Sequence, residues 1–374
     1  MIGVKGQWAA QINGDEIESD EFRMLILEEK ADLSLPTVHF QFQTKDPEKM
    51  ERFNTPGYKV KIGLGKEDAS KIVANFRVFK KKIVTFQGND NWALDLWMIL
   101  DHLPYYNEHR METYNTWSDL KKSSEVVSTV CSRVGLIPKV SSSDDKMLWI
   151  QPNVPDRRFL EDVTQHGWFG ENKPVAFGIN RKGEMLYKPV KELLTTKFKI
   201  GNMKDADLAV DEYGITTSDG LFSSWVGKTR NVPTNLHEEG IYVDKDIDSR
   251  YDSEVEPQIS NEIGLYEDKK FAPITWQNDN VHYYWNKAEA QNLQFRASIA
   301  SQTMEVSQHG GYRDVYVLDC LTGTWERIVG GKPVAIPEIN GKWLVSRLRH
   351  FIYANSYRID LFLSRERMMK LPKL

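Results

Sequence analysis

Two segments, one near each end of the chain, alternate apolar and polar residues with a period of two. The first, Thr37–Thr44, reads TVHFQFQT, and the second, Tyr357–Leu363, reads YRIDLFL. Successive side chains of an extended chain point to opposite faces, so this period predicts strands with one buried face. The side chains expected to share that face in the second segment are Tyr357, Ile359, Leu361 and Leu363. The fold must therefore accommodate sheet at both ends of the chain.

Further strand signals fill the first hundred residues. Tyr58–Leu64 repeats the alternation, and Phe76–Phe79 and Ile83–Phe86 flank three consecutive lysines, Lys80–Lys82. A charged tip keeps a hairpin soluble, so the lysines are expected at a turn. Residues 1–100 are predicted to form an antiparallel barrel or sandwich.

The middle of the chain changes to a helical period. A helix is expected after the capping residues Ser123 or Ser124, ending at Gly135, and a second one from Asp156 to Gly167. Both carry apolar residues on one face and end at a glycine, as helices commonly do.

A hairpin follows these helices. Val175–Ile179 and Glu184–Tyr187 are short apolar runs separated by the turn sequence NRKG, Asn180–Gly183. Together with the two helices, this hairpin makes residues 101–195 a small α/β unit between β-rich regions.

Residues 196–285 give the weakest signal. Asp244–Gln258 is acidic and has few bulky apolar residues, which favours a long surface loop. Asn286 with Glu289 forms a capping signature for a third helix. After it the chain is β-rich again, and Trp343–Ile352 with Tyr357–Leu363 predicts a C-terminal hairpin.

Charge and composition exclude several classes of function. The chain has 374 residues, with 49 basic against 53 acidic side chains and a formal net charge of −4. A phosphate backbone favours a basic protein, so no nucleic-acid specificity is expected. Trp92–Leu100, the most apolar run, is too short to span a membrane. Cys131 and Cys320 are expected to be buried thiols in a soluble protein made in a cytoplasm.

No motif for catalysis stands out. Gly227-Lys228-Thr229 resembles the end of a phosphate-binding loop, but Phe222 stands where that loop needs a glycine. The eight histidines show no metal-binding spacing. Adjacent carboxylates such as Glu28-Glu29 and Asp144-Asp145 would point to opposite faces of a strand. We expect no catalytic, cofactor-binding or metal-binding residues, no cofactor, and no enzymatic activity.

The aromatic run Tyr283-Tyr284-Trp285 allows two interpretations. It could form a stacking platform for a glycan or a nucleic acid. Aromatic residues also supply buried area in cores and at interfaces, and the surrounding sequence lacks the basic residues of a single-strand groove. Packing is the favoured interpretation.

The order of these segments resembles the central hub of contractile bacteriophage baseplates, a family related to the spike-bearing hub of type VI secretion. The resemblance depends on six sequence segments in order along the chain. They are WSDLKKSSEVVSTVCSRVGL (Trp117–Leu136), LWIQPNVPDRRFLEDVTQHG (Leu148–Gly167), VAFGINRKGEMLY (Val175–Tyr187), AEAQNLQFRASIAS (Ala288–Ser301), GGKPVAI (Gly330–Ile336) and GKWLVSRLRHFIYANSYRIDLFLSR (Gly341–Arg365).

This resemblance implies an α+β, mainly β fold with two antiparallel tube-type β-barrel domains and an α/β unit inserted between them. The first barrel would span residues 1–100, the α/β intermediate domain 101–195, and the second barrel 196–374, with loop insertions around 226–285. Tyr357, Ile359, Leu361 and Leu363 would lie in the wall of the second barrel or at a subunit interface.

The resemblance also implies a structural function in the virion tail baseplate, assembled in the host cytoplasm. The chain would form a homotrimeric ring with pseudo-six-fold symmetry that joins the hexameric tail tube to the central trimeric spike. Its partners would be itself, the tail tube protein, the central spike protein, the tape measure protein and other baseplate proteins. Two alternatives are a hub-associated enzyme that degrades the cell wall and a cytosolic binding module.

Overall fold

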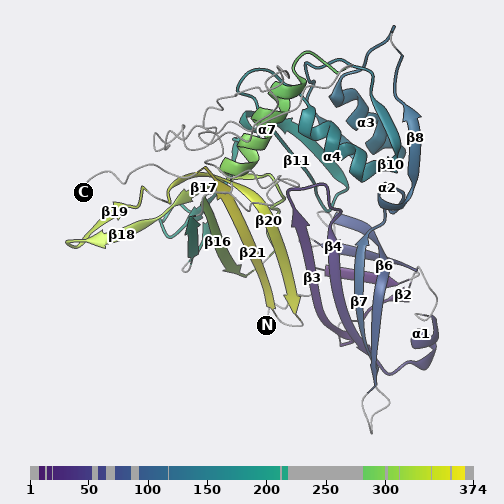
Figure 1. The fold of residues 1–374 in the computed structure, drawn as a ribbon. Helices are drawn as coiled ribbons and strands as arrows, with labels where there is room; N and C mark the ends of the chain where they lie inside the picture. Colours follow the sequence, from purple (N-terminus) through teal and green to yellow (C-terminus); the bar gives the residue numbers. More distant parts are fainter. Residues whose placement is uncertain are drawn as a thin grey trace.

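The computed structural model describes residues 8–12, 15–18, 20–52, 58–64, 72–85, 92–116, 118–210, 213–217, 281–299, 302–310, 312–337, 339–353 and 356–366. Most of them lie in strands, and the longer helices gather above the sheet strands (Figure 1). The expected α+β, mainly β fold class is confirmed. Buried side chains from the strands and the helices form one contiguous hydrophobic core.

The N-terminal strands pair with one another in antiparallel fashion. They are β1 (Trp8–Ile12), β2 (Asp15–Glu16), β3 (Phe22–Lys30), β4 (Thr37–Thr44), β5 (Lys59–Leu64), β6 (Ile72–Thr85) and β7 (Trp92–Leu100), and the short helix α1 (Pro47–Arg52) follows β4. Along β4 the alternation predicts the faces correctly, because Val38, Phe40 and Phe42 are buried whereas His39 is half-buried.

The predicted hairpin at Lys80–Lys82 is wrong, because β6 continues through the lysines without a turn. Strand β7 pairs with this stretch, so that Lys82 lies opposite Asp95. Lys80 Nζ lies 4.6 Å from the ring centroid of Trp97 on the same neighbour. An aromatic face and a carboxylate on the adjacent strand thus accommodate a charged run inside a sheet, and no turn is needed.

The C-terminal strands belong to the same sheet. They are β13 (Thr196–Gly201), β14 (Leu208–Ala209), β15 (Tyr213–Thr217), β16 (Gln302–His309), β17 (Cys320–Thr324), β20 (Gly341–Tyr353) and β21 (Ser356–Arg365). Strands β20 and β21 form the predicted C-terminal hairpin. Strands β18 (Glu326–Val329) and β19 (Lys332–Ala335) form a separate two-stranded hairpin.

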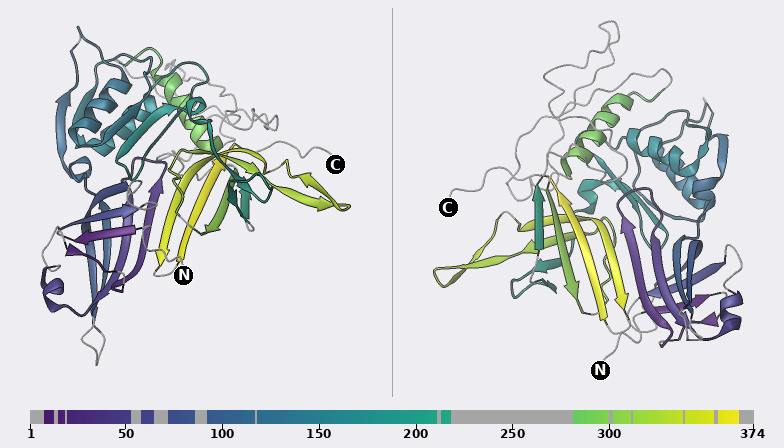
Figure 2. Two further views of the ribbon diagram at one scale, coloured as in Figure 1. Left: turned by 180° about the vertical axis from the view of Figure 1, so that it is seen from behind. Right: turned by 60° about the horizontal axis from the view of Figure 1, so that its bottom comes forward.

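One 14-stranded sheet therefore joins the two ends of the chain, in the order β14-β13-β17-β20-β3-β4-β7-β6-β5-β1-β2 with β21, β16 and β15 as a branch from β20. The pairing of β3 with β20 links the halves. Strand β20 has a register shift between Val345 and Arg347. It pairs with β17 before this irregularity and with β3 after it. The two halves of the sheet curve and lie side by side (Figure 2).

The α/β unit lies above the N-terminal strands in Figure 1. It contains α2 (Pro104–Asn107), β8 (His109–Thr113), α3 (Ser123–Arg133), β9 (Ile137–Val140), β10 (Ile150–Pro155), α4 (Asp156–His166), β11 (Val175–Ile179), β12 (Glu184–Pro189) and α5 (Val190–Leu193). Its small sheets have the orders β10-β8 and β11-β12-β9. The two helices and the hairpin predicted for this region are confirmed.

The start of α3 is stabilised by residues from outside the helix. The Ser123 amide donates to Asp145 Oδ1 at 2.7 Å, and the Ser124 amide donates to Ser143 Oγ at 3.1 Å. Asp145 is buried and also accepts from the Trp168 amide at 2.6 Å. The predicted capping role of Ser123 or Ser124 is therefore wrong: the residue at the cap position is Lys122, and the Asp145 carboxylate and the Ser143 hydroxyl satisfy the amides of Ser123 and Ser124.

Helix α7 (Trp285–Ile299) packs against α4 of the α/β unit, although it lies more than a hundred residues further along the chain. The rings of Trp285 and His166 stack with their centroids 3.6 Å apart. Trp285 is the first residue of α7, so the helix begins one residue before the predicted cap at Asn286.

Both cysteines are buried thiols, as expected. Among the described residues, no helix combines the length and the apolar content that a membrane span requires. The predicted loop at Asp244–Gln258 lies outside the described residues, as does all of 218–280. The division into domains at residues 100 and 195 stays a prediction.

Candidate functional site: the Arg181 junction

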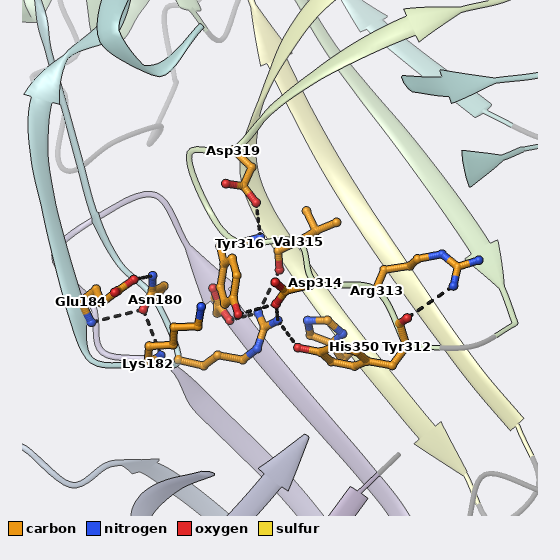
Figure 3. A network of polar contacts seen from close by, with 12 residues as sticks. Asn180, Lys182, Glu184, Tyr312, Arg313, Asp314, Val315, Tyr316, Asp319 and His350 are labelled. Atoms are coloured by element: carbon orange, nitrogen blue, oxygen red, sulfur yellow. Dashed lines mark hydrogen bonds and ion pairs between the residues drawn. The ribbon is translucent and has the colours of Figure 1, made fainter. Parts of the chain in front are cut away.

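The turn between β11 and β12 places a buried arginine where three parts of the chain meet: the N-terminal strands, the α/β unit and the C-terminal strands. Asn180 holds the turn, because its Oδ1 accepts from the amides of Lys182 at 2.9 Å and Glu184 at 3.2 Å (Figure 3). Gly183 adopts a φ of +74°, in the left-handed region that favours glycine. The turn geometry thus directs Arg181 into the protein, where it is 1% exposed.

Arg181 bonds to residues from two other regions of the chain. Its Nη1 donates to Glu29 Oε1 on β3 at 2.5 Å and to the Val315 carbonyl at 2.9 Å. Its Nη2 donates to the Tyr312 hydroxyl at 2.6 Å. Glu29 is also 1% exposed. One side chain of the α/β unit therefore connects the N-terminal strands to the loop that precedes β17.

Tyr316 on that loop is surrounded by cations. The centroid of its ring lies 4.1 Å from Arg181 Cζ, 4.3 Å from Lys182 Nζ and 4.6 Å from Lys197 Nζ. Its hydroxyl donates to Asp314, and its amide donates to Asp319 Oδ2 at 2.8 Å. Three positive charges near one aromatic ring attract its electron-rich face and fix the loop against the α/β unit.

The network continues into β20 and β21. His350 on β20 is fully buried, and its Nδ1 lies 2.6 Å from the hydroxyl of Tyr357 on β21. The Tyr312 ring stacks on the His350 ring, with centroids 5.6 Å apart and planes inclined by 16°. The Arg181 junction, defined here as Glu29, Arg181, Tyr312, Tyr316, His350 and Tyr357, thus spans all three parts of the chain.

Burial dominates the electrostatics of the junction. Burial raises the pKa of the Glu29 carboxyl, against the opposing effect of the Arg181 charge. Burial also disfavours the charged form of Arg181, but the Glu29 carboxylate and the tyrosine hydroxyls outweigh it and raise the pKa of the guanidinium. Burial and the nearby Arg181 charge hold the pKa of His350 well below its usual value, so the imidazole is neutral at neutral pH.

This arrangement is suited to holding structure together. A buried ion pair with hydrogen bonds to several segments fixes their relative positions, and it is costly to break because one charge would remain buried alone. Across the described residues, no group of three or more His, Cys, Asp or Glu side chains is placed to hold a metal ion. The interactions at the Arg181 junction are therefore ion pairing and aromatic packing.

Arg181 was predicted only as part of a turn, and its burial was not predicted. A signal was present in β3, where Leu25, Leu27 and Glu29 occupy one face of the alternation. A carboxylate on a face that is otherwise apolar needs a buried partner. The sequence gives no means of finding that partner, which is 152 residues away along the chain.

The structure places Tyr357, Ile359, Leu361 and Leu363 in the core of the chain. All four are buried, at 3%, 0%, 0% and 0% exposure respectively. Their expected place in the wall of a second barrel stays a prediction. A contact with another subunit stays a prediction, and it would involve the opposite face of β21, where Arg358 and Phe362 are half-buried.

Glu28 and Glu29 separate as predicted, whereas Asp144 and Asp145 lie outside any strand. Glu29 points into the core, whereas Glu28 lies on the other face of β3, within 3.5 Å of Arg349 Nε. Asp145 is buried and Asp144 is exposed. Gly227-Lys228-Thr229 lies outside the described residues.

The aromatic run at the start of α7 is divided between packing and exposure. Trp285 is buried, and the ring of Tyr284 stacks on Trp168 with centroids 4.9 Å apart. Tyr283 is 94% exposed. Packing therefore accounts for two of the three rings, and the run offers no continuous stacking platform.

No protein-family model matches this chain, and no curated protein matches it. Solved structures match over nearly its whole length. A 43 kDa tail protein of prophage MuSo2 from Shewanella oneidensis is 9% identical, with a TM-score of 0.58 over 98% of this chain and 100% of that chain. A tail protein from Neisseria meningitidis is 8% identical, with a TM-score of 0.57 over 96% of each chain.

A third structure comes from Escherichia coli. It is a component of the type VI secretion system with structural similarity to the T4 bacteriophage tail proteins gp27 and gp5. It is 8% identical, with a TM-score of 0.50 over 98% of this chain and 79% of that chain. At such identities the likeness concerns the fold. The chain has the fold of these phage tail and type VI secretion proteins, which confirms the resemblance found in the sequence.

Proposed function

We propose that this chain is the structural hub of a phage tail baseplate, which forms a homotrimeric ring between the hexameric tail tube and the central trimeric spike. The observation that carries the proposal is the fold match to two phage tail proteins over at least 96% of this chain. Both matched structures are tail proteins, and the match extends over nearly the whole of each chain, which supports a structural role in the tail.

The layout of the sheet supports the symmetry that this role requires. Two curved β-rich halves lie side by side in one chain, joined through β3 and β20 (Figure 2). Three such chains around an axis present six β-rich units, which is the number a six-fold tube offers. The same three chains keep three-fold symmetry toward a spike.

The Arg181 junction supports a rigid hub. An adaptor between two rings works only if its parts keep a constant angle, and the junction ties the α/β unit to both halves of the sheet. Its charges are buried, so they are less sensitive to salt than surface ion pairs are. The proposed partners are the tail tube protein, the central spike protein, the tape measure protein and other baseplate proteins, in the virion tail.

Mass measurement in solution tests the proposal. Light scattering and native mass spectrometry of the full chain, alone and mixed with its tube and spike neighbours, should give three copies per particle. A closed dimer, a ring of six full-length chains, or a monomer under all of these conditions would overturn the two-units-per-chain argument.

We also propose that the chain is not an enzyme. In a peptidoglycan zymogram it should leave the substrate layer intact. A cleared band at 43.3 kDa would favour the alternative of a hub-associated enzyme that degrades the cell wall.

A further inference from the structure

Three aromatic residues hold the start of α7 to the α/β unit. His282, which precedes the helix, and Trp285, its first residue, are both buried. The Trp285 ring stacks on the His166 ring of α4, with centroids 3.6 Å apart, and the Tyr284 ring stacks on the Trp168 ring with centroids 4.9 Å apart. Helix α7 lies beside α4 in Figure 1. His282, Tyr284 and Trp285 are together called the α7 latch.

The hydrogen bonds of His282 require its ring to be neutral. The Tyr284 amide donates to His282 Nδ1 at 3.2 Å, so Nδ1 carries no proton. His282 Nε2 lies 2.9 Å from the His166 carbonyl oxygen, which only accepts, so Nε2 carries the proton. A proton added to Nδ1 would face the Tyr284 N–H, and that hydrogen bond would break. Protonation of His282 therefore opposes the closed latch.

Asp145 is the carboxylate whose charge acts on His282, but it has no room for a further donor. Its two oxygens already accept from the Ser123 amide, the Ser123 hydroxyl, the Ser143 hydroxyl and the Trp168 amide, at 2.7, 2.7, 2.7 and 2.6 Å. A carboxylate accepts about four hydrogen bonds. Burial lowers the pKa of His282 despite the Asp145 charge.

His166 responds to protonation in the opposite sense. Its Nδ1 lies 2.9 Å from the Asp162 carbonyl oxygen, so Nδ1 carries a proton and Nε2 is the atom that titrates. Nε2 lies 3.7 Å from Glu289 Oε2 on α7, and the ring lies against Trp285. A proton on Nε2 thus gains a carboxylate and an aromatic face.

The surroundings of His166 favour its charged form. Burial opposes that form, but the Asp162 and Glu289 carboxylates outweigh burial and raise the pKa of the ring. A charge on His166 in turn disfavours a charge on His282. The two histidines therefore take up protons at different pH values, His166 first as the pH falls.

The second half of α7 is attached by a group that does not titrate. Asn292 Oδ1 accepts from the Val175 amide at 3.0 Å, and Asn292 Nδ2 donates to the carbonyls of Gln165 and Gly167 at 2.9 and 3.0 Å. A side-chain amide keeps its protonation state between pH 5 and 8. A change of pH should therefore act on residues 281–289 and leave residues 292–299 in place.

We propose that the α7 latch is a pH-sensitive contact, which is tightest at about pH 6.5 and opens locally when His282 gains a proton. In the open latch, water surrounds both rings, and each has the ordinary histidine pKa of about 6.5. The inference goes beyond the proposed function and does not depend on self-association.

The two histidines affect the latch on opposite sides of that pH. The contribution of His166 to the closed latch is fully present below about pH 6.5 and is lost as the pH rises through its raised pKa. The contribution of His282 is fully present above about pH 6.5 and is lost as the pH falls toward its lowered pKa. The closed latch is therefore most stable where the two ranges meet.

Hydrogen exchange of the full chain between pH 5 and 8 tests the proposal, with each rate divided by the intrinsic rate at the same pH. Protection of residues 281–289 should be greatest at about pH 6.5. Below it, protection should fall by up to about tenfold per pH unit, the effect of one proton. Protection should also fall toward pH 8. Residues 292–299 should stay equally protected, and a parallel change in both segments would overturn the proposal.

Two substitutions of His282 assign the loss of protection at acid pH. In His282→Asn the side-chain oxygen accepts from the amide two residues further on, as asparagine does in turns, and it cannot titrate. His282→Gln replaces the ring with a second amide that does not titrate. Both variants should stay closed down to pH 5. His109→Asn removes an exposed histidine of β8 and should keep the profile of the parent.

His166→Phe assigns the loss of protection at alkaline pH, because it keeps a ring against Trp285 and removes the titrating nitrogen. This variant should show no loss between pH 6.5 and 8. Acid opening that persists in both His282 variants, or that disappears in His109→Asn, would overturn the assignment to His282. The parent profile decides the matter even where a variant fails to fold. A pH-independent latch would leave the hub proposal intact, because that proposal is tested by the mass of the particle.

Discussion

At the scale of single residues, Glu28 and Glu29 show how position decides what a charge contributes. The two are adjacent on β3, yet the Glu28 side chain is 20% exposed and lies near surface arginines, whereas the Glu29 side chain is fully buried against Arg181. Ion pairs near the surface contribute little to stability because water and salt screen them. A buried pair contributes mainly through the penalty for separating it.

The first prediction is that Arg181→Met strongly destabilises the chain. It would leave Glu29 buried without its partner, and the free energy of unfolding should fall by about 3–5 kcal/mol. Chemical denaturation followed by circular dichroism measures this change.

Two variants control that experiment. Arg349→Met removes a partner of Glu28 at the surface and should lower the free energy of unfolding by less than about 1 kcal/mol. Combining Arg181→Met with Glu29→Gln removes the unpaired charge and should recover part of the loss. If Arg181→Met and Arg349→Met cost the same, the Arg181 junction would not hold the chain together.

The second prediction concerns His350 and pH. Its pKa in the folded chain lies well below its usual value because of burial and the Arg181 charge. An unfolded histidine binds a proton below about pH 6.5, and the buried one does not. The unfolded state therefore binds more protons. The contribution of His350 to the free energy of unfolding should be fully present above pH 6.5 and should be lost as the pH falls below it.

His350→Gln isolates this contribution. The groups that face His350 are Tyr312, Tyr357 and Arg181, and none changes charge between pH 5 and 8, since burial raises the pKa of both tyrosines and the arginine stays charged. His166 has a raised pKa and acts in the opposite sense in both proteins. Urea unfolding at pH 5, 6, 7 and 8 should show a shallower acid loss in His350→Gln. Parallel curves would contradict the assignment.

Residue-scale prediction from sequence succeeds where local pattern decides and fails where a distant partner decides. The separation of Glu28 from Glu29 follows from strand geometry alone. The burial of Arg181 depends on Glu29, Tyr312 and Val315, which come from segments more than a hundred residues away. A turn sequence such as NRKG carries no sign of such partners.

At the scale of elements, the C-terminal hairpin carries the third prediction. Leu361 on β21 is fully buried, so Leu361→Asp would place a carboxylate in the core without a partner. The free energy of unfolding should fall by more than about 3 kcal/mol, and trimer recovery should fall with it. Thermal melting and native mass spectrometry measure the two effects.

Arg358 on the other face of the same strand provides the control. Its Nε lies 3.0 Å from Asp360 Oδ1, and its guanidinium lies 4.3 Å from the Phe351 ring centroid. Arg358→Ala should be mild in the single chain. A Leu361→Asp variant that melts and assembles like the parent would mean that β21 does not occupy the core.

Elements with a strong local period were predictable, and elements shaped by neighbours were less so. Strand β4 and helices α3 and α4 follow directly from the spacing of their apolar residues. Strand β6 was divided wrongly, because its lysines are accommodated within the pairing with β7, where the Trp97 ring lies beside Lys80 and Asp95 lies opposite Lys82. The start of α3 was assigned to its own serines, because Asp145 lies 22 residues away from Ser123.

At the scale of the whole molecule, the union of the two β-rich ends and their contact with the α/β unit were beyond sequence analysis. Strand β3 pairs with β20 across more than three hundred residues, and no local pattern specifies that register. Gly178 on β11 lies against the end of β3 at this place. A Cβ added to Gly178 would lie 3.3 Å from Ala31 Cα and 3.5 Å from Leu318 Cδ1.

The fourth prediction follows from that close approach. In Gly178→Val the new side chain would press on the backbone of Ala31, which the Ala31 amide fixes by donating to the Ser346 carbonyl at 2.8 Å. Backbone held in a sheet yields less readily than a side chain, so the α/β unit should be displaced from the sheet at a cost of about 1–3 kcal/mol. Hydrogen exchange should then accelerate in the end of β3, in residues 312–319 and in the β11–β12 turn.

Gly214 on β15 is the matched control, since a Cβ added there meets no heavy atom within 4 Å and Gly214→Val should leave exchange unchanged. Faster exchange confined to β11, with β3 and the 312–319 loop unaffected, would show that the three parts are only loosely attached. A hub transmits force between a tube and a spike only if its parts are firmly attached to one another. The exchange pattern of Gly178→Val therefore tests the rigidity on which the proposed function depends, separately from the number of copies in the ring.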